Sequence, residues 1–255
     1  MNTDPRIVTT VEGTTAVITI NRPEKLNALD AAMMTALEQA AIAIDANPII
    51  RVCIITGAGE KSFCAGGDIA AWSQQSPHEF GMAWVRHGHR AFAALTRMRQ
   101  PLIAALNGHT LGGGLELAST ADFRIAEEQI KLGLPETGIG IIPGWSGTQR
   151  SVRRFGAQVV RRMAIAGEVF TAAQALALGL VDHVVPKSHS LTAAHDMAKA
   201  IAERGSFATS AAKIMINAAE NEDQEAALEA MAGIAAASHD ELKTKVATFI
   251  NRKKT

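Results

Sequence analysis

Three consecutive glycines, Gly112, Gly113 and Gly114, followed closely by Glu116, are the residues best suited to chemistry in this sequence. The segment 103–118 predicts a strand, a turn and then a helix that begins near the glycines. Glycines let a backbone approach a ligand closely, and the N–H groups at a helix start favour negative charge. This arrangement is typical of an oxyanion site that a nearby carboxylate can reach. Spacing alone leaves open the alternative that the glycines serve only packing and that Glu116 is a first-turn glutamate favoured by the helix dipole.

Two further segments place candidate groups in similar positions. A glycine-rich loop, 62–69, lies between a predicted strand and a predicted helix that Asp68 can cap, and it could supply a second backbone N–H to the same anion. Glu136 follows Pro135 on a rigid turn and could bring a second carboxylate. Taken singly, the first segment also fits an ordinary turn, and a lone glutamate in a loop is more often solvated than catalytic.

Other familiar catalytic motifs are missing. The sequence contains no GxGxxG and no GxxxxGK[ST], so it offers no nucleotide-phosphate loop. Residues 144–147 resemble a nucleophile elbow, but Thr148 stands where that motif needs glycine. The eight histidines show no metal-ligand spacing, and His87 and His89 are interpreted as surface residues of one helix. No metal is therefore expected.

The predicted elements that would position these groups alternate between strands and helices, which is typical of an α/β fold. Asp30 is expected to cap a helix that runs through Asn47, and residues 171–178 are expected to form a capped helix that ends before Gly179. Beyond residue 190 the chain is rich in Ala, Lys and Glu at helical period, with no strand signal. We therefore expect an α/β core with the active site over residues 1–190 and a helical region over 191–255. The remaining expected elements are strands at 17–20, 51–56, 101–106, 123–126, 130–134 and 181–185, and helices at about 77–99 and 115–121.

Composition narrows the class of protein. The chain has 255 residues, with 25 Lys and Arg balanced by 25 Asp and Glu, so no net charge favours nucleic-acid binding. No apolar run approaches the roughly 18 residues that cross a bilayer, and the first residues lack the pattern of a signal peptide. Its two cysteines, Cys53 and Cys64, suit free thiols in a reducing compartment. These features predict a cytoplasmic protein that binds neither nucleic acid nor membranes.

Several ordered segments together resemble the enoyl-CoA hydratase/isomerase (crotonase) superfamily. The resemblance runs from about residue 6 to 250, and its strongest part is 103–123, which matches the family signature without a gap. Two departures stand out: Trp145 and Ser146 replace the small residues usual in hydratases, and residues 243–245 replace an acidic–Gly pair. The other matching segments are 21–29, 63–69, 134–136, 142–144, 147–150 and 175–185.

The resemblance implies a crotonase-like spiral of repeated ββα units with a helical C-terminal trimerisation region, in a homotrimer or a hexamer built as a dimer of trimers. It implies that the backbone N–H groups of Ala65 and Gly113 bind the acyl thioester oxygen, and that Glu116 and Glu136 are the acid/base carboxylates. Coenzyme A would arrive as part of an acyl-CoA substrate, so no separate cofactor is expected. The implied substrate-binding residues are Lys25, Leu26, Ala28, Ala65, Gly66, Gly67, Asp68, Gly112 and Gly113.

The implied reaction is addition of water to a 2-enoyl-CoA, with Glu116 activating water and Glu136 delivering the proton to Cα. Glutamate at both positions favours a hydratase over a Δ3,Δ2-enoyl-CoA isomerase or another crotonase-type CoA-thioester lyase, which stay as alternatives. A silent CoA-binding or assembly module and an RNA-binding role through paired arginines are further alternatives. Trp145 either shortens the acyl pocket or packs as a loop aromatic on the core.

Overall fold

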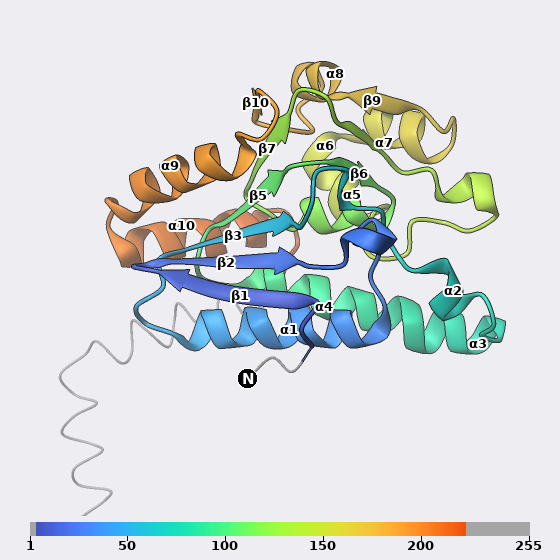
Figure 1. Cartoon of the computed structure of the whole chain (residues 1–255), viewed down its shortest axis with the longest axis horizontal. Helices are drawn as coiled ribbons and strands as arrows, with labels where there is room; N and C mark the ends of the chain where they lie inside the picture. Colours follow the sequence, from blue (N-terminus) through green and yellow to red (C-terminus); the bar gives the residue numbers. More distant parts are fainter. Residues whose placement is uncertain (1–3, 223–255) are drawn as a thin grey trace, which may run out of the picture.

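The computed structural model describes residues 4–222, which form two β-sheets with helices around them (Figure 1). The larger sheet has the strand order β1-β2-β3-β5-β7-β10; β1 and β2 pair antiparallel, and the other pairs are parallel. Its strands are β1 (Ile7–Glu12), β2 (Thr15–Ile20), β3 (Val52–Gly57), β5 (Leu102–Leu106), β7 (Phe123–Glu127) and β10 (His183–Val185). The smaller sheet, in its spatial order, contains β4 (Ser62–Cys64), β6 (His109–Leu111), β8 (Lys131–Gly133) and β9 (Val169–Thr171).

The two sheets are linked by a repeated ββα arrangement. β3, β5 and β7 are neighbours in the larger sheet, and the strands that follow them, β4, β6 and β8, are neighbours in the smaller one. Each of these pairs leads into a short helical segment: α2, α5 or the 3₁₀ helix η3. The chain thus repeats one unit three times, which confirms the expected crotonase-like spiral.

Helices cover both faces of the larger sheet. α1 and α4 pack together on one face, and α9 contacts β3, β5 and β7 on the other (Figure 1). The helical segments in chain order are η1 (Pro23–Lys25), α1 (Ala31–Ala46), α2 (Ile69–Trp72), α3 (Pro77–Glu79), the π-helical η2 (Phe80–Val85), α4 (Arg86–Arg97), α5 (Gly113–Ala118), η3 (Glu136–Ile139), α6 (Arg150–Phe155), α7 (Ala157–Ala164), α8 (Ala172–Ala177), α9 (Ser190–Ala202) and α10 (Ser206–Ala219).

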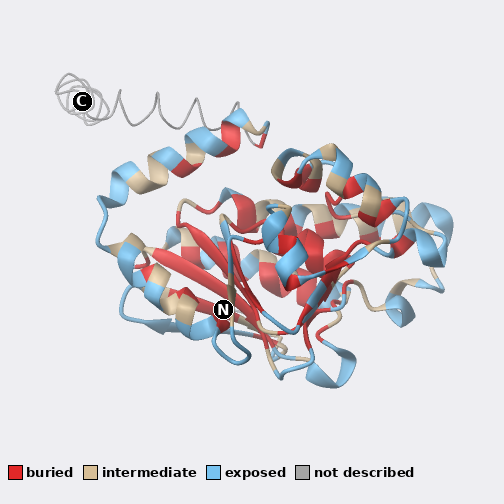
Figure 2. Cartoon of the chain, turned by 90° about the horizontal axis from the view of Figure 1, so that it is seen from above, coloured by how far each residue is buried: buried red, intermediate tan, exposed pale blue. Residues whose placement is uncertain are grey.

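The central strands are buried on both faces, as strands covered by helices on each side must be. Every residue of β3 and of β5 is buried, and Figure 2 shows these strands inside a shell of exposed helix surface. Alternate residues point to opposite faces: Ile55 packs on the α1 and α4 side, whereas Ile54 packs against α9. Burying such a side chain stabilises the fold by roughly 1.5–3 kcal/mol.

Local capping signals in the sequence correctly locate several helices. Asp30 accepts a hydrogen bond from Met33 N (3.0 Å) at the start of α1, and Asp68 accepts one from Ala70 N (3.1 Å) at the start of α2. Thr171 and Gln174 form a capping box on α8. The three-residue strands β4, β6 and β9 were not predicted from the sequence, whereas β8 and β10, which are equally short, lie within the strands predicted at 130–134 and 181–185.

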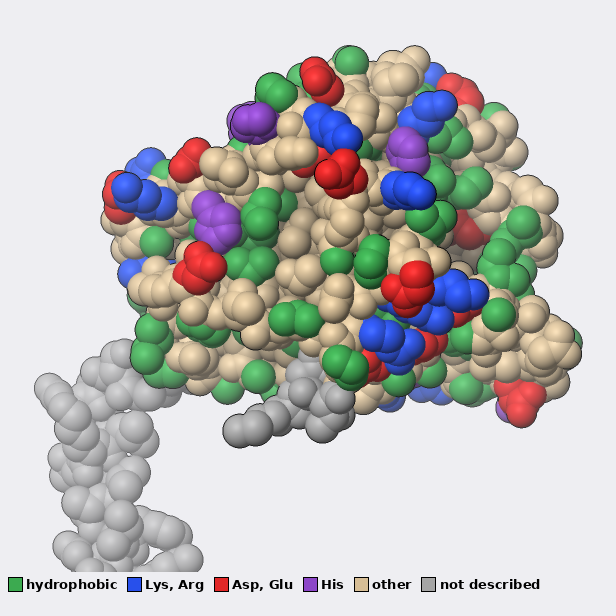
Figure 3. All heavy atoms as spheres, in the orientation of Figure 1, with side chains coloured by type: hydrophobic (Ala, Val, Ile, Leu, Met, Phe, Trp, Pro, Cys, Tyr) green, Lys and Arg blue, Asp and Glu red, His purple; other side chains and the backbone are tan. Residues whose placement is uncertain are grey.

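The described surface shows no segregation of charge on the face in Figure 3, where acidic and basic side chains are interspersed. Within residues 4–222, no helix has the length and apolar character needed to cross a membrane.

The helix α10 is attached to the core by buried polar contacts. Lys213 Nζ donates to the Gln100 carbonyl oxygen (2.8 Å), and Asn217 Nδ2 donates to the Thr96 carbonyl oxygen (3.0 Å). The predicted division at residue 190 stays a prediction, and its part beyond 222 lies outside the described residues.

Candidate active site

The residues expected to do chemistry occupy equivalent places in the three repeats. Ala65 follows β4 directly, Gly113 lies two residues after β6, and Glu136 lies three residues after β8. Since β4, β6 and β8 are parallel neighbours, their carboxyl ends meet at one edge of the smaller sheet. Ligands of α/β folds commonly bind outside such an edge. The ββα repeat therefore converts three distant segments into one site.

A cavity of about 250 Å³ lies at this edge. Glu116 and Glu136 both line it, in otherwise mostly apolar surroundings. The other lining residues are Ala65, Gly66, Gly67, Ile69, Trp72, Phe80, Trp84, Val85, Gly112, Gly113, Pro135, Ile139, Ile141, Ile142, Gly144 and Trp145. Trp72 and Trp84 are among the lining residues. The cavity thus brings together seven of the predicted site residues: Ala65, Gly66, Gly67, Gly112, Gly113, Glu116 and Glu136.

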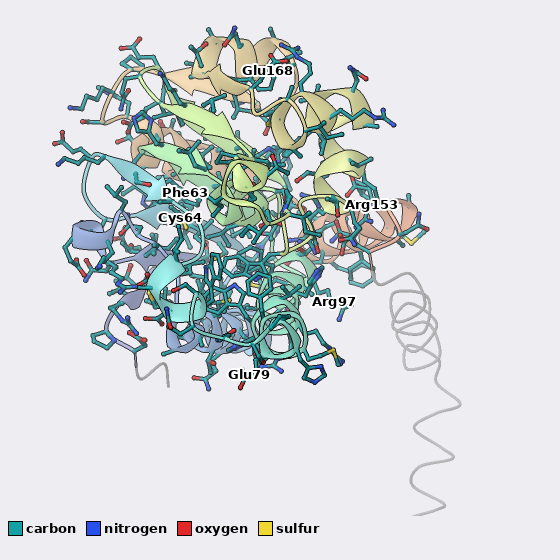
Figure 4. The ribbon with its side chains drawn as sticks, turned by 90° about the vertical axis from the view of Figure 1, so that its right-hand side faces the viewer. Phe63, Cys64, Glu79, Arg97, Arg153 and Glu168 are labelled. Atoms are coloured by element: carbon teal, nitrogen blue, oxygen red, sulfur yellow. The ribbon has the colours of Figure 1, made fainter. Side chains whose placement is uncertain are left out.

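The two glycine loops are held against each other by backbone contacts that leave no room for side chains. A β-carbon added at Gly114 would lie 1.9 Å from the carbonyl oxygen of Cys64, a residue of the buried strand β4 that is labelled in Figure 4. Gly66 has a φ of +99°, which side chains disfavour, and a β-carbon there would lie 2.9 Å from Gly113 N. The glycines are therefore required for the approach of one loop to the other.

The two predicted oxyanion donors differ in the structure. Gly113 N–H, in the first turn of α5, has no hydrogen-bond partner among residues 4–222. Ala65 N–H donates to the Leu26 carbonyl oxygen at 3.1 Å. Gly113 is thus ready to bind an anionic oxygen, whereas Ala65 can do so only if its bond to Leu26 is shared or released.

Asn27 holds the N-terminal motif against the first glycine loop. This fully buried side chain accepts from Arg22 N (2.9 Å) and donates to the carbonyl oxygens of Ala58 (2.9 Å) and Ser62 (2.7 Å). Leu26 and Ala65 consequently line a second cavity of about 430 Å³ next to the first. This neighbouring cavity is a candidate channel for the larger part of a substrate.

The remaining predicted substrate-binding residues have other visible partners. Asp68 caps α2 and pairs with Arg22 at 2.9 Å, and the Ala28 carbonyl accepts from Arg22 Nη1 at 3.1 Å. Lys25 is exposed at the end of η1. Their contact with CoA stays a prediction.

The Glu116 carboxylate is bound by a small backbone nest that the sequence analysis missed. Its Oε1 accepts hydrogen bonds from Trp145 N and Gly147 N, both at 2.6 Å. Between these donors, Ser146 adopts a φ of +82°, and alternating backbone handedness of this kind turns successive N–H groups toward one anion. Gly147 is needed here, because a β-carbon would lie 2.7 Å from the same Oε1.

His89 supports this nest from α4. Its Nδ1 lies 3.0 Å from Ser146 Oγ. Burial lowers the pKa of His89, and the positive charge of Arg150 lowers it further. The interpretation of His89 as a surface residue is therefore wrong, since the side chain is half-buried and bonded to the site loop. Only the glycine and proline content of residues 142–147 could have signalled this loop in the sequence.

Glu136 lies in a different environment. Its side chain is buried (9% exposed), and neither carboxyl oxygen has a hydrogen-bond partner within residues 4–222. A buried anion without donors is costly, whereas a neutral carboxylic acid tolerates such a place far better. Glu136 is therefore suited to carry a proton.

Burial raises the pKa of both carboxyl groups. Desolvation followed by the nearby charge of Glu136 raises the pKa of Glu116 to about 8, and desolvation raises the pKa of Glu136 to about 7. The two groups interact, so we expect them to hold one proton between them near neutral pH. The pKa of Glu116 is the higher of the two partly because it includes repulsion by an ionised Glu136, and that repulsion is absent while Glu136 holds the proton. The hydrogen bonds of the nest then favour the negative charge on Glu116, and the absence of donors within residues 4–222 favours the proton on Glu136.

We expect Glu136→Gln to raise thermal stability more at alkaline than at acidic pH. The folded pKa of Glu136 lies above its ordinary value of 4.5, so its burial costs nothing extra below about pH 4.5, and the cost grows until the pH passes about 7. Glutamine stays neutral, so relative to wild type the variant should gain on the order of 2–3 kcal/mol between about pH 4 and pH 8.5. Thermal unfolding at these two pH values measures the gain. Glu128→Gln, at an exposed position, is the control, and an equal response from both variants would contradict the burial argument.

The comparison with protein families decides the classification. The family model described as "Enoyl-CoA hydratase/isomerase" matches residues 10–255. The chain belongs to this family. Among relatives, it is 36% identical over 245 residues to a crotonyl-CoA hydratase of Syntrophomonas wolfei, covering 94% of this chain and 92% of that protein. It is also 36% identical over 245 residues to a short-chain-enoyl-CoA hydratase of Clostridium acetobutylicum, covering 95% and 94%.

Solved structures support the same fold. An enoyl-CoA hydratase from Bacillus anthracis superposes with a TM-score of 0.81 at 32% sequence identity, and the match covers 96% of each chain. Membership of the enoyl-CoA hydratase/isomerase family and the crotonase-like fold are therefore both shown. The departure at residues 243–245 lies outside the described residues.

Proposed function

We propose that this chain is a 2-enoyl-CoA hydratase, a lyase that adds water to the double bond of the thioester to give a 3-hydroxyacyl-CoA. The observation that carries the proposal is the pair of buried carboxyls, Glu116 and Glu136, in one cavity beside Gly113 N–H, which has no hydrogen-bond partner within residues 4–222. The crotonyl-CoA and short-chain-enoyl-CoA hydratases among the relatives support it.

The glycine loops serve the thioester oxygen. Addition of water at Cβ moves negative charge onto this oxygen in an enolate-like transition state. Gly113 N–H at the start of α5 meets that charge, and Ala65 N–H joins it by releasing or sharing its bond to Leu26. Losing one such donor typically costs roughly 2.7–4 kcal/mol of transition-state stabilisation.

The carboxyl pair moves the protons. Glu116, fixed through Oε1 by the nest, keeps its second oxygen to take a proton from the attacking water. Glu136, whose carboxyl oxygens have no hydrogen-bond partner within the described part of the chain, carries the proton and gives it to Cα. After one turnover Glu116 holds the proton and Glu136 the charge, and exchange with water restores the starting state.

Product analysis tests this proposal against its alternatives. Wild-type protein mixed with crotonyl-CoA should remove the enone absorbance and give a product heavier by one water. An isomerase would instead convert a 3-enoyl-CoA into a 2-enoyl-CoA of unchanged mass. Binding of CoA thioesters with no turnover on either substrate would support a silent module, and salt-sensitive RNA retention would support the RNA-binding alternative.

Assembly and location extend the proposal. We infer a homotrimer or homohexamer from the family resemblance. The balanced charge argues against a nucleic-acid partner, the lack of a long apolar run against a membrane partner, and the two cysteines suit the cytoplasm as free thiols. No resident cofactor or metal is proposed. Among residues 4–222, no three His, Cys, Asp or Glu side chains gather in a group that could hold a metal ion.

A further inference from the structure

The indole of Trp145 forms a wall of the active-site cavity against both glycine loops. The side chain is buried (3% exposed) and lines the cavity. A β-carbon added at Gly67 would lie 3.1 Å from its Cη2, and one added at Gly113 would lie 2.6 Å from its Cζ3. The ring thus packs directly on the backbone of the loops that face the thioester oxygen.

A third glycine, on α4, accommodates the other edge of the indole. A β-carbon added at Gly88 would lie 2.1 Å from Trp145 Nε1 and 2.2 Å from Cδ1. Glycine within a helix costs stability relative to alanine, so its presence here calls for a packing reason. The indole supplies that reason, since no side chain fits at residue 88 while the ring is in place.

Two further aromatic rings fix the orientation of the indole. The centroid of Trp84 lies 5.3 Å from that of Trp145, and Phe92 contacts the same ring edge-on at 5.3 Å. Such tilted and edge-on pairs are favourable aromatic geometries. The wall is therefore held on several sides and cannot swing away without breaking these contacts.

The position of this wall relative to the chemistry determines which substrates fit. Trp145 N donates to Glu116, and Glu116, Trp84 and Trp145 all line the same cavity. An acyl chain bound with its Cβ at Glu116 would therefore have Trp145 and Trp84 in the wall around its continuation. The cavity of about 250 Å³ is also smaller than the roughly 300–1,000 Å³ usual for ligand pockets.

We propose that Trp145, seated on Gly88, is a specificity-determining residue that limits the site to 2-enoyl thioesters with short acyl chains. The inference rests on the proposed hydratase function and adds to it the class of acyl group. It explains the large aromatic and the helix glycine by one physical requirement.

Chain-length kinetics of a Trp145 variant test the proposal. Wild type should prefer crotonyl-CoA to trans-2-hexenoyl-CoA and trans-2-decenoyl-CoA. Trp145→Ala keeps the backbone N–H to Glu116, and should raise the kcat/KM ratio of decenoyl-CoA to crotonyl-CoA by at least about tenfold, because one methylene in such a pocket already discriminates by 10–200-fold. Trp145→Phe should raise the same kcat/KM ratio by a smaller factor. This variant replaces the alanine variant in the test if the alanine variant does not fold. An unchanged ratio in the folded variants overturns the proposal.

Gly88 gives a second test with a matched control. Gly88→Ala should lower Tm by at least about 3 °C, because overpacking outweighs the gain in helix propensity. Gly81→Ala, in the adjoining segment η2 with open space around its β-carbon, should not lower it. In the Trp145→Ala background, Gly88→Ala should become neutral or stabilising. Equal loss in both backgrounds would overturn the pairing of these residues.

Binding of saturated thioesters separates this inference from the proposed function. Butyryl-CoA and decanoyl-CoA have no double bond and cannot be hydrated, so their affinities measure how well each acyl chain fits beside Trp145, independently of catalysis. Suppose that wild type fails to hydrate crotonyl-CoA, but Trp145→Ala improves decanoyl-CoA binding at least about tenfold relative to butyryl-CoA. The hydratase proposal is then wrong, and the proposal that Trp145 limits acyl-chain length is supported. If wild type hydrates crotonyl-CoA and Trp145→Ala leaves the ratio of the two affinities unchanged, the proposal for Trp145 is wrong and the hydratase proposal is supported.

Discussion

Replacing either Glu116 or Glu136 by glutamine is expected to lower kcat for crotonyl-CoA hydration by roughly 10²–10⁴-fold in variants that still fold. Glutamine keeps the shape of each side chain but can neither accept a proton from water nor deliver one to Cα. At residue 116, its amide oxygen can still accept the hydrogen bonds from Trp145 N and Gly147 N. The loss therefore measures proton transfer rather than collapse of the nest.

Steady-state kinetics and thermal unfolding of the same preparations check this prediction. Glu128→Gln, at an exposed position away from the cavity lining, should keep wild-type rates. The two site variants should also lose activity non-additively, because the carboxyls act as one unit. A folded single variant that turns over crotonyl-CoA at the wild-type rate would remove that residue from the mechanism.

Gly66→Ala should place a methyl group directly against the backbone donor that the proposed mechanism assigns to the thioester oxygen. The new β-carbon would lie 2.9 Å from Gly113 N, the backbone donor that has no other partner within the described residues. We expect kcat/KM to fall by roughly 10²–10³-fold, comparable to loss of one oxyanion donor. The φ of +99° adds a stability loss of about 1–3 kcal/mol.

Gly167→Ala separates these two effects. Gly167 also has a positive φ, +71°, but a β-carbon there meets nothing within 4 Å. Its alanine variant should lose stability and keep its kcat/KM. If both variants lose only stability, the contact between Gly66 and Gly113 has no catalytic importance.

The sequence predicts well those features that depend on neighbouring residues. The cap at Asp30, the capped helix expected over 171–178 and the glycine-to-helix transition near Gly113 are all local, and each is confirmed. The short strands β4 and β6 escaped prediction because they border glycine-rich loops, whereas β8 and β10, which are equally short, lie within predicted strands. The strands β4 and β6 acquire strand structure only by pairing with distant segments, Ser62 with His109 for example.

Prediction of the active site from the sequence is limited in the same way, because it reaches only contacts between neighbouring residues. Glu116 and Glu136 were predicted from their motifs, but the nest on Glu116 joins residues about thirty positions apart and leaves no local signal. The seat of Trp145 on Gly88 and the bond of Ser146 to His89 likewise depend on the packing of α4 against the loop. The bond from Ala65 N–H to Leu26 is a third such contact, and it changes what the first oxyanion donor must do.

The central claim is that one protonated and one ionised carboxyl add water to a thioester held at the glycine loops. The most direct test is crotonyl-CoA in water labelled with oxygen-18, with wild type beside a folded Glu116→Gln/Glu136→Gln double variant. We predict that wild type places the label in the 3-hydroxyl group of the product and that the double variant forms no product above background. Wild type that leaves crotonyl-CoA unchanged, or a double variant that hydrates it at the wild-type rate, would contradict the claim.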